Sequence, residues 1–239
     1  MERFFLAALC RAPGVGSRVA ASLVRVFGSA QDAWHARAEA LRAAHLSPER
    51  AAALHDFCRR NEALPEKIAA ACEKGGISLF VPSDEAYPAR LKEIYNPPQT
   101  LFCRGSLDCL KHPAVAMVGA RHASAYGKGA AEDIALGLAE RGFVVVSGAA
   151  RGIDTASHKG ALQAGETVAV LGCGVDVAYP RENARLLAEI AEKGAVISEY
   201  APGTAPLAAF FPARNRIISG IAHGTIVVEA AERSGSLIT

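Results

Sequence analysis

The chain has 239 residues, of which 51% are hydrophobic and 21% are charged, a balance that excludes an intrinsically disordered protein. No apolar run reaches the roughly 18 residues that cross a bilayer, and residues 1–9 lack a secretory signal, so we expect a cytoplasmic protein without a membrane partner. The net charge of +2 is too small to indicate a polyanionic partner by itself.

The six cysteines are scattered, and no two of them form a C-x-x-C pair. This spacing predicts buried free thiols rather than a zinc site or a disulfide framework. We therefore expect no bound metal.

Residues 1–64 have a helical pattern throughout, because they are rich in alanine and place apolar residues three and four positions apart. Ala12-Pro13-Gly14-Val15-Gly16, followed by an apolar-spaced helix over 17–26, is typical of a helix-hairpin-helix, so we predict a small SAM-like helical domain here. Glycines in such a hairpin free backbone N–H groups for a DNA phosphate. A plain tight turn between two packed helices is the open alternative.

Residues 65–112 form a connecting segment with one helix, an apolar stretch over 77–81 and proline-marked turns, which predicts a strand that extends the following sheet. From residue 113 to 239, short valine-rich runs alternate with helical segments. Such runs are expected in a parallel sheet covered by helices on both faces. We predict an α/β fold, a Rossmann-like three-layer sandwich with a mainly parallel sheet, and strands over 115–118, 143–146, 168–171, 195–198 and 225–228.

Three of the predicted strands run into glycine-containing turns. Because the carboxyl ends of parallel strands share one edge, these turns are expected together, where backbone amides of the following helices collect anions. The alternative is that each glycine only permits close packing of helix on strand. The turns are Val118-Gly119-Ala120-Arg121, Ser147-Gly148-Ala149-Ala150-Arg151-Gly152 and Leu171-Gly172-Cys173-Gly174.

Charge placement favours a phosphate-binding edge. No acidic residue occurs over 109–131 or over 200–228, and the second stretch holds Phe210-Phe211-Pro212-Ala213-Arg214-Asn215-Arg216. Aromatic rings beside arginines suit single-stranded nucleic acid, in which bases stack on rings and cations hold phosphates. The alternative is that the rings belong to the core and the arginines pair with Asp154 or Glu229.

Catalytic and cofactor motifs are weak. His158 stands one turn after Asp154, and the structural interpretation, a pair that steadies the helix start, is favoured because no nucleophile stands beside it. Gly172 and Gly174 lack the third glycine of a dinucleotide fingerprint, so we expect no cofactor. Ser234-Gly235-Ser236 is read as an anion-accepting turn or as the start of another helix.

The motifs together resemble those of the DNA-processing protein A (DprA, or Smf) family, over nearly all of the chain. The matching segments are Gly119-Ala120-Arg121 with Ser124, Tyr126 and Gly127; residues 147–154 with His158; Gly172-Cys173-Gly174 with Asp176, Tyr179, Pro180 and Asn183; Ser198-Glu199-Tyr200; residues 211–218; and Glu229-Ala230 with residues 234–239.

The resemblance implies a helical N-terminal domain, a Rossmann-like domain that binds single-stranded DNA, and a role in loading a RecA-type recombinase during natural transformation. It implies no catalysis. Carried over by position, Arg121, Arg151, Phe211 and Arg214 would line the DNA pocket, and Gly119, Ser124 and Ser147 would supply its anion-binding edge. Gly148, Asn215 and Arg216 complete the set of predicted DNA-binding residues.

Two departures from the family pattern stand out. Many relatives carry a DNA-contacting lysine before Phe-Pro, where this chain has Pro206-Leu207-Ala208-Ala209, so one cation is absent. Relatives also continue beyond the position of Thr239 through strands that form a homodimer and contact the recombinase. We therefore expect the sequence to be a fragment in which dimerisation and recombinase loading are impaired.

An enzyme is the main alternative function class, and a purely structural adaptor, in which the glycine turns serve only packing, is the third. A nucleoside monophosphate N-glycosidase on a related fold would use the same phosphate-binding turns. It would also need a carboxylate beside them, for which Glu199 and Glu229 are the candidates.

Overall fold

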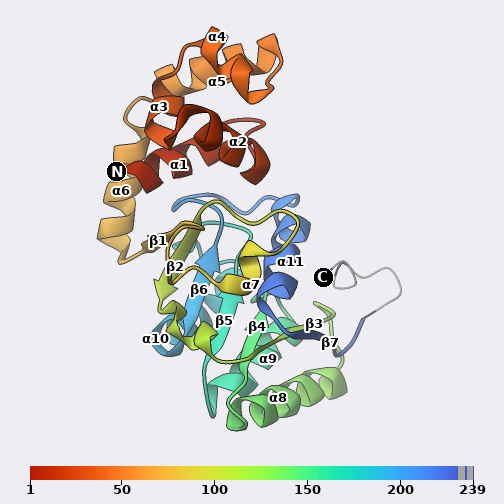
Figure 1. Ribbon diagram of the computed structural model, residues 1–239. Helices are drawn as coiled ribbons and strands as arrows, with labels where there is room; N and C mark the ends of the chain where they lie inside the picture. The colour runs from red at the N-terminus through yellow and green to blue at the C-terminus, as the bar shows by residue number, and fades with distance from the viewer. Residues whose placement is uncertain (231–234, 236–238) are drawn as a thin grey trace.

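The computed structural model of the chain describes residues 1–230, 235 and 239. Its described strands form one seven-stranded sheet in the order β1-β2-β6-β5-β4-β3-β7 (Figure 1). The strands are β1 (Ser78–Phe80), β2 (Leu101–Gly105), β3 (Ala114–Val118), β4 (Val144–Ser147), β5 (Thr167–Val170), β6 (Ala195–Ser198) and β7 (Gly224–Val227).

The five strands predicted from residue 115 onward are confirmed to within one or two residues as β3 to β7. Their pairings, β3 with β4 and β7, and β5 with β4 and β6, are all parallel. The connecting segment adds β1 and β2 as antiparallel strands at one edge. A mainly parallel α/β sheet is therefore confirmed, and the embellishment predicted before residue 113 consists of two strands rather than one.

Helices of the second half cover both faces of the sheet, as the unbroken apolar strands require. Alternate residues of each strand point to opposite faces: Val145 packs with α8 and α9, whereas Val144 and Val146 pack with α11. The helices are α7 (Ala89–Lys92), α8 (Ala125–Glu140), α9 (Ile153–Leu162), α10 (Ala184–Lys193) and α11 (Phe210–Ile221), with the 3-10 turns η2 (Leu107–Lys111) and η3 (Arg181–Asn183).

The first 75 residues are helical, and Figure 1 shows them stacked above the sheet. Residues 13–16 form the predicted turn between the first two helices. The elements are α1 (Glu2–Cys10), α2 (Ser17–Phe27), α3 (Ala30–His35), α4 (Ala38–Leu41), η1 (Arg42–Ala44), α5 (Pro48–Arg60) and α6 (Leu64–Gly75).

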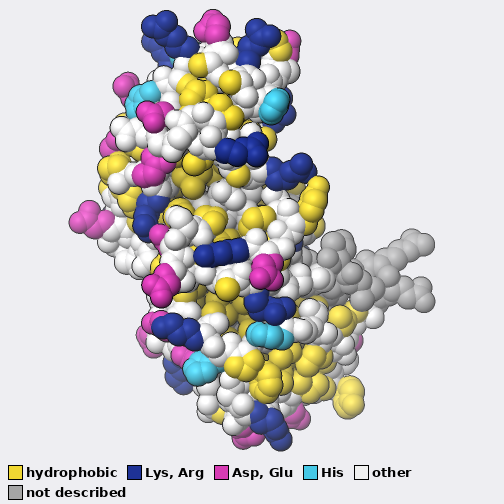
Figure 2. Space-filling model, in the orientation of Figure 1, with side chains coloured by type: hydrophobic (Ala, Val, Ile, Leu, Met, Phe, Trp, Pro, Cys, Tyr) yellow, Lys and Arg dark blue, Asp and Glu magenta, His cyan; other side chains and the backbone are white. Residues whose placement is uncertain are grey.

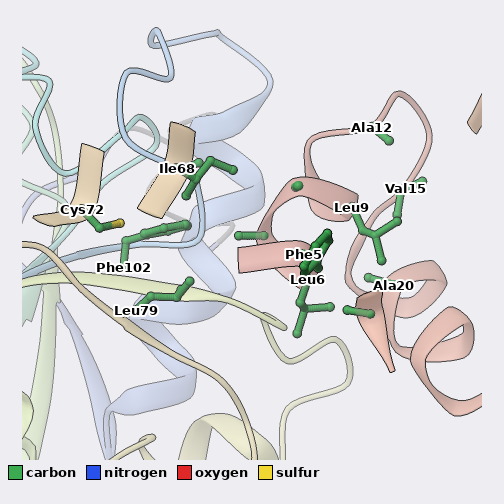
Figure 3. Packing of buried hydrophobic residues seen from close by; sticks show 14 of the residues in the cluster. Phe5, Leu6, Leu9, Ala12, Val15, Ala20, Ile68, Cys72, Leu79 and Phe102 are labelled. Atoms are coloured by element: carbon green, nitrogen blue, oxygen red, sulfur yellow. The ribbon is translucent and has the colours of Figure 1, made fainter. Parts of the chain in front are cut away.

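One hydrophobic cluster joins this helical part to the sheet. In Figure 3, Ile68 and Cys72 of α6 lie beside Leu79 and Phe102 of the sheet, and the same cluster continues into α1 through Phe5. Because α6 packs against α1 as well, the helical packing extends beyond residue 64. The domain limits given from the sequence remain predictions.

The cysteines and His158 are buried side chains about which the sequence makes predictions. Five of the six cysteines are buried and the sixth, Cys10, is half-buried, all as free thiols, as predicted. His158 is fully buried, but its Nδ1 lies 2.7 Å from Thr167 Oγ1 on β5 and its partner is not Asp154. The carboxylate of Asp154 instead turns back to accept from the Ala150 amide, so its helix start is stabilised without the histidine.

No helix among the described residues has both the length and the apolar character needed to cross a membrane. On the face drawn in Figure 2, basic and acidic side chains alternate from the helical part down to the sheet. On the face drawn, neither sign of charge covers a large area by itself.

Candidate nucleic-acid interface

The carboxyl edge of the parallel strands is hollowed into two adjoining cavities. The first has a volume of 450 Å³ and the second 740 Å³. They share Arg121, Tyr179, Phe211 and Arg214 as lining residues, so they form one groove. Loops after β3, β4 and β5 supply most of its walls, and the loop after β6 and the first turns of α11 contribute the others, among them Pro206 and Phe211.

Aromatic rings and a guanidinium lie together in the wall of the groove. The ring centroids of Tyr179 and Phe211 are 5.2 Å apart and their planes are tilted by 33°. The guanidinium carbon of Arg121 lies 5.5 Å from the centroid of Phe211, within the range of a cation–π contact. Tyr179 and Arg121 are exposed, so the cluster presents π-surface and positive charge to solvent.

Arg214 forms the floor of the groove and is only 4% exposed. Its Nη1 donates to the carbonyl of Gly148, at 2.9 Å, and to that of Val170, so it closes the ends of β4 and β5. A side chain at position 148 would not fit, since a Cβ there would lie 2.6 Å from the guanidinium of Arg214. This glycine therefore serves close packing, the alternative considered for such turns.

A buried carboxyl group lies close to this cation. Asp154 also lines the second cavity and is 7% exposed. Burial raises the pKa of Asp154, and the charge of Arg214 works against that rise. Because the two groups partly neutralise each other and Arg214 is only 4% exposed, its main role is structural.

Arg151 reaches the rim of the first cavity, where its Nε forms an ion pair with Oε1 of Glu182. The two side chains are 60% and 51% exposed. The hydrogen bond from Arg151 lowers the pKa of the Glu182 carboxyl, so Glu182 is charged at neutral pH.

Two of the predicted residues, Gly119 and Asn215, line the second cavity, and Gly148 lines the first. Three others do not line either cavity: Ser124, Ser147 and Arg216. Ser147 is fully buried and its hydroxyl donates to the Met117 carbonyl at 2.6 Å.

Ser124 caps α8, where its Oγ accepts from the Gly127 amide at 2.9 Å. The backbone N–H and the hydroxyl of Ser124 both donate to the carboxylate of Glu229. The helix N-terminus that the sequence offered to a phosphate therefore already holds an anion of the chain itself.

Arg216 forms a two-pronged ion pair with Glu199, with both N–O distances 2.6 Å, and donates to the Asn96 carbonyl at 2.9 Å. It faces a separate cavity of 650 Å³ between the helical part and the sheet, together with Pro13 and Gly16 of the predicted helix-hairpin-helix. The arginine thus has a carboxylate partner, as the alternative interpretation of the motif expected, although the partner is Glu199 rather than Asp154 or Glu229.

Six residues that line the first cavity are absent from the predicted DNA-binding set: Ala150, Tyr179, Pro180, Arg181, Glu182 and Pro206. Tyr179 and Pro180 were noted only as family motif positions. The sequence feature that could have identified them as lining residues is their position as a Tyr-Pro pair after the glycine turn that follows β5. Pro206 belongs to the segment without the expected lysine, so an apolar side chain lines the groove there.

Among the described residues, no cluster of three or more histidine, cysteine, aspartate or glutamate side chains is placed to bind a metal ion.

Comparison with known proteins identifies the chain's relatives. The family model described as DNA recombination-mediator protein A matches residues 78–239. The chain belongs to this family. The DNA processing protein DprA of Streptococcus pneumoniae is 54% identical over 157 residues, which is 65% of this chain and 55% of that relative. The Smf protein of Synechocystis is 35% identical over 247 residues, covering 100% of this chain and 61% of that protein.

Solved structures of the DNA recombination-mediator family share the fold. The X-ray structure of DprA from Streptococcus pneumoniae superposes with a TM-score of 0.84 at 38% identity, covering 100% of this chain and 81% of that one. DNA processing protein A from Helicobacter pylori, solved to describe its single-stranded DNA binding mode, gives a TM-score of 0.63 at 32% identity over 68% of this chain and 73% of that one. The present chain spans between 44% and 61% of the length of the curated relatives that it matches.

Proposed function

We propose that the groove at the carboxyl edge of the sheet binds single-stranded DNA without reading its sequence. The observation that carries the proposal is the contact of Phe211 with both Tyr179 and Arg121 in the wall of the groove. Every base has a π-face, so a base released from a duplex can stack on such rings whatever its identity.

The charges around the rings fit a phosphate backbone. Arg121, Arg151 and Arg181 are exposed at the first cavity, with Arg214 beneath them, against one acidic residue among its described lining residues. A guanidinium group can bind two phosphate oxygens at once, and such a phosphate contact does not depend on the identity of the base. In this proposal the predicted residues Arg121, Arg151 and Phe211 contact DNA directly, and Tyr179 joins them.

The remaining predicted residues take supporting roles in the proposal. Gly148 and Arg214 shape the floor of the groove, and Gly119 and Asn215 line its second cavity. Ser124, Ser147 and Arg216 hold surrounding loops through the contacts described above.

At the level of the whole protein, we propose a role in recombination, in which the DNA-bound protein loads a RecA-type recombinase during natural transformation. Membership in the recombination-mediator family supports this role. The proposal also includes a homodimer and a cytoplasmic location, where incoming DNA and recombinase meet.

The test is fluorescence anisotropy of a labelled oligo-dT titrated with the protein at several salt concentrations, beside a duplex of equal length. We expect salt-dependent binding that favours the single strand, and similar affinity for mixed sequences. Equal affinity for duplex and single strand, or no binding by a chain that is folded by circular dichroism, would contradict the proposal.

An enzymatic role is the weaker candidate, because both carboxylates considered for it are engaged elsewhere. Glu199 is paired with Arg216 on the separate cavity, and Glu229 closes the N-terminus of α8. Incubation with each nucleoside monophosphate, followed by chromatography, is expected to release no free base. Release of a base would support the glycosidase alternative instead.

A further inference from the structure

We infer that Glu182 competes with DNA for Arg151, so that this carboxylate occupies the position of a phosphate until DNA displaces it. The inference rests on the proposed function and adds a residue that sets the affinity of the groove. Glu182 and Arg151 both line the first cavity and form an ion pair across its rim. A carboxylate and a phosphate present similar oxygen pairs to a guanidinium, so one can replace the other.

The pair is built to be exchangeable. Its two side chains are 60% and 51% exposed, and water and salt screen ion pairs of this kind strongly. Arg151 has no other hydrogen-bond partner among the described residues, so nothing else fixes the direction of its guanidinium. Breaking the pair therefore costs little, and Arg151 is free to turn to a phosphate.

The backbone of the pair, by contrast, is fixed. Asn183, next to Glu182 and 6% exposed, donates to the Ala149 carbonyl and to Thr155 Oγ1, each at 2.9 Å. These two acceptors flank Arg151 in the chain, so the loop with Glu182 is tied to the loop with Arg151. The carboxylate consequently stays near the cation at a high local concentration after DNA has displaced it.

Glu229, the other carboxylate at this edge of the sheet, has a structural role. Glu229 accepts from both the backbone N–H and the hydroxyl of Ser124, at 3.0 and 2.7 Å, and so closes the start of α8. Its removal would free a helix terminus as well as a charge. Glu182 lies within η3, a single 3-10 turn, and it is the one acidic residue among the described residues that line the first cavity.

The test compares Glu182→Gln with Glu189→Gln. Glu189 forms an exposed ion pair with Arg185 on α10, away from the groove, so both variants lose one carboxylate from an exposed arginine pair and change the net charge equally. We expect Glu182→Gln to bind oligo-dT about two- to fivefold more tightly than the unaltered chain, because an exposed pair contributes little. Glu189→Gln should match the unaltered chain.

A double-mutant comparison separates direct competition from a general effect of charge. In an Arg151→Ala background, Glu182→Gln is expected to lose most of its gain, because the cation that it frees is absent. An equal gain with and without Arg151 would overturn the inference. So would equal affinities of Glu182→Gln and the unaltered chain when both bind, which leaves the proposed function standing. Absence of binding by both folded proteins would overturn the proposed function and this inference together.

Discussion

Tyr179 and Phe211, which come from the loop after β5 and from the first turn of α11, place their ring centroids 5.2 Å apart at the edge of the sheet. Neither the loop after β5 nor the first turn of α11 forms a binding surface alone. Together the two rings form a wall of π-surface beside exposed arginines, on which a base of the DNA could stack.

Replacing Phe211 with alanine should weaken binding of oligo-dT by about five- to a hundredfold, since stacking of a base on a ring contributes about 1–3 kcal/mol. Its neighbour Phe210 provides the matched control. Phe210 stacks on Tyr200 at 4.1 Å and lines the separate cavity, so Phe210→Ala should bind nearly as well as the unaltered chain. The measurement is anisotropy, with circular dichroism to verify folding. Similar losses in both variants would argue against the assigned wall.

Arg121→Gln should reduce affinity and flatten the salt dependence. If Arg121 contacts one phosphate, its loss should lower the slope of log affinity against log salt by about 0.7. The ring contact of Arg121 with Phe211 would be lost too, which adds to the weakening. Arg185→Gln is the control, because Arg185 is 93% exposed on α10. An unchanged slope for Arg121→Gln would place the DNA elsewhere.

Arg216→Ala should affect stability rather than DNA binding. Arg216 and Glu199 are 24% and 14% exposed, so removing the arginine leaves a largely buried carboxylate without its partner. We expect the free energy of unfolding to fall by about 1–3 kcal/mol, while affinity for oligo-dT stays within about twofold. Urea denaturation and anisotropy measure the two effects. A large loss of affinity without a loss of stability would return Arg216 to the DNA-contacting set.

The stability of the protein should decrease as the pH falls below neutral, because of His158. Burial, and to a lesser extent the charge of Arg214, lowers the pKa of His158 from 6.5 to about 3. Between about pH 3 and pH 6.5, His158 is protonated in the unfolded chain and neutral in the folded chain, so acidification favours unfolding. The slope is at most about 1.4 kcal/mol per pH unit, or roughly 2 kcal/mol between pH 7 and pH 5.

Urea titrations at pH 7 and pH 5 measure this effect. In His158→Asn, the amide N–H can replace the Nδ1 contact with Thr167, and no titrating group remains. The variant should therefore lose less stability than the unaltered chain over the same interval. An equal loss in both proteins would assign the pH dependence to other groups.

Much of the fold was predictable from local patterns. Strands such as β4, with three consecutive valines, are fully buried only in a sheet that is covered on both faces, and the helical pattern of the first residues follows from their spacing of apolar side chains. The segments with Arg121, Arg151 and Phe211 were likewise predictable from glycine turns and acid-free stretches, because parallel strands bring their carboxyl ends to one edge. The segment over 234–236, read as a turn, lies outside the described residues except for Gly235.

Partners of individual side chains were not predictable, because they depend on distances between segments far apart in the chain. The motif over 210–216 gives no sign of this division, yet about two turns of α11 place Phe211 at the groove, Phe210 and Arg216 at another cavity, and Arg214 in the core. The sequence alone determined the parallel sheet and the edge where its glycine turns gather, through local periodicity. Only the tertiary structure decided which cations face solvent there, since Glu182, Glu199 and Glu229 reach their partners through the packing of whole elements.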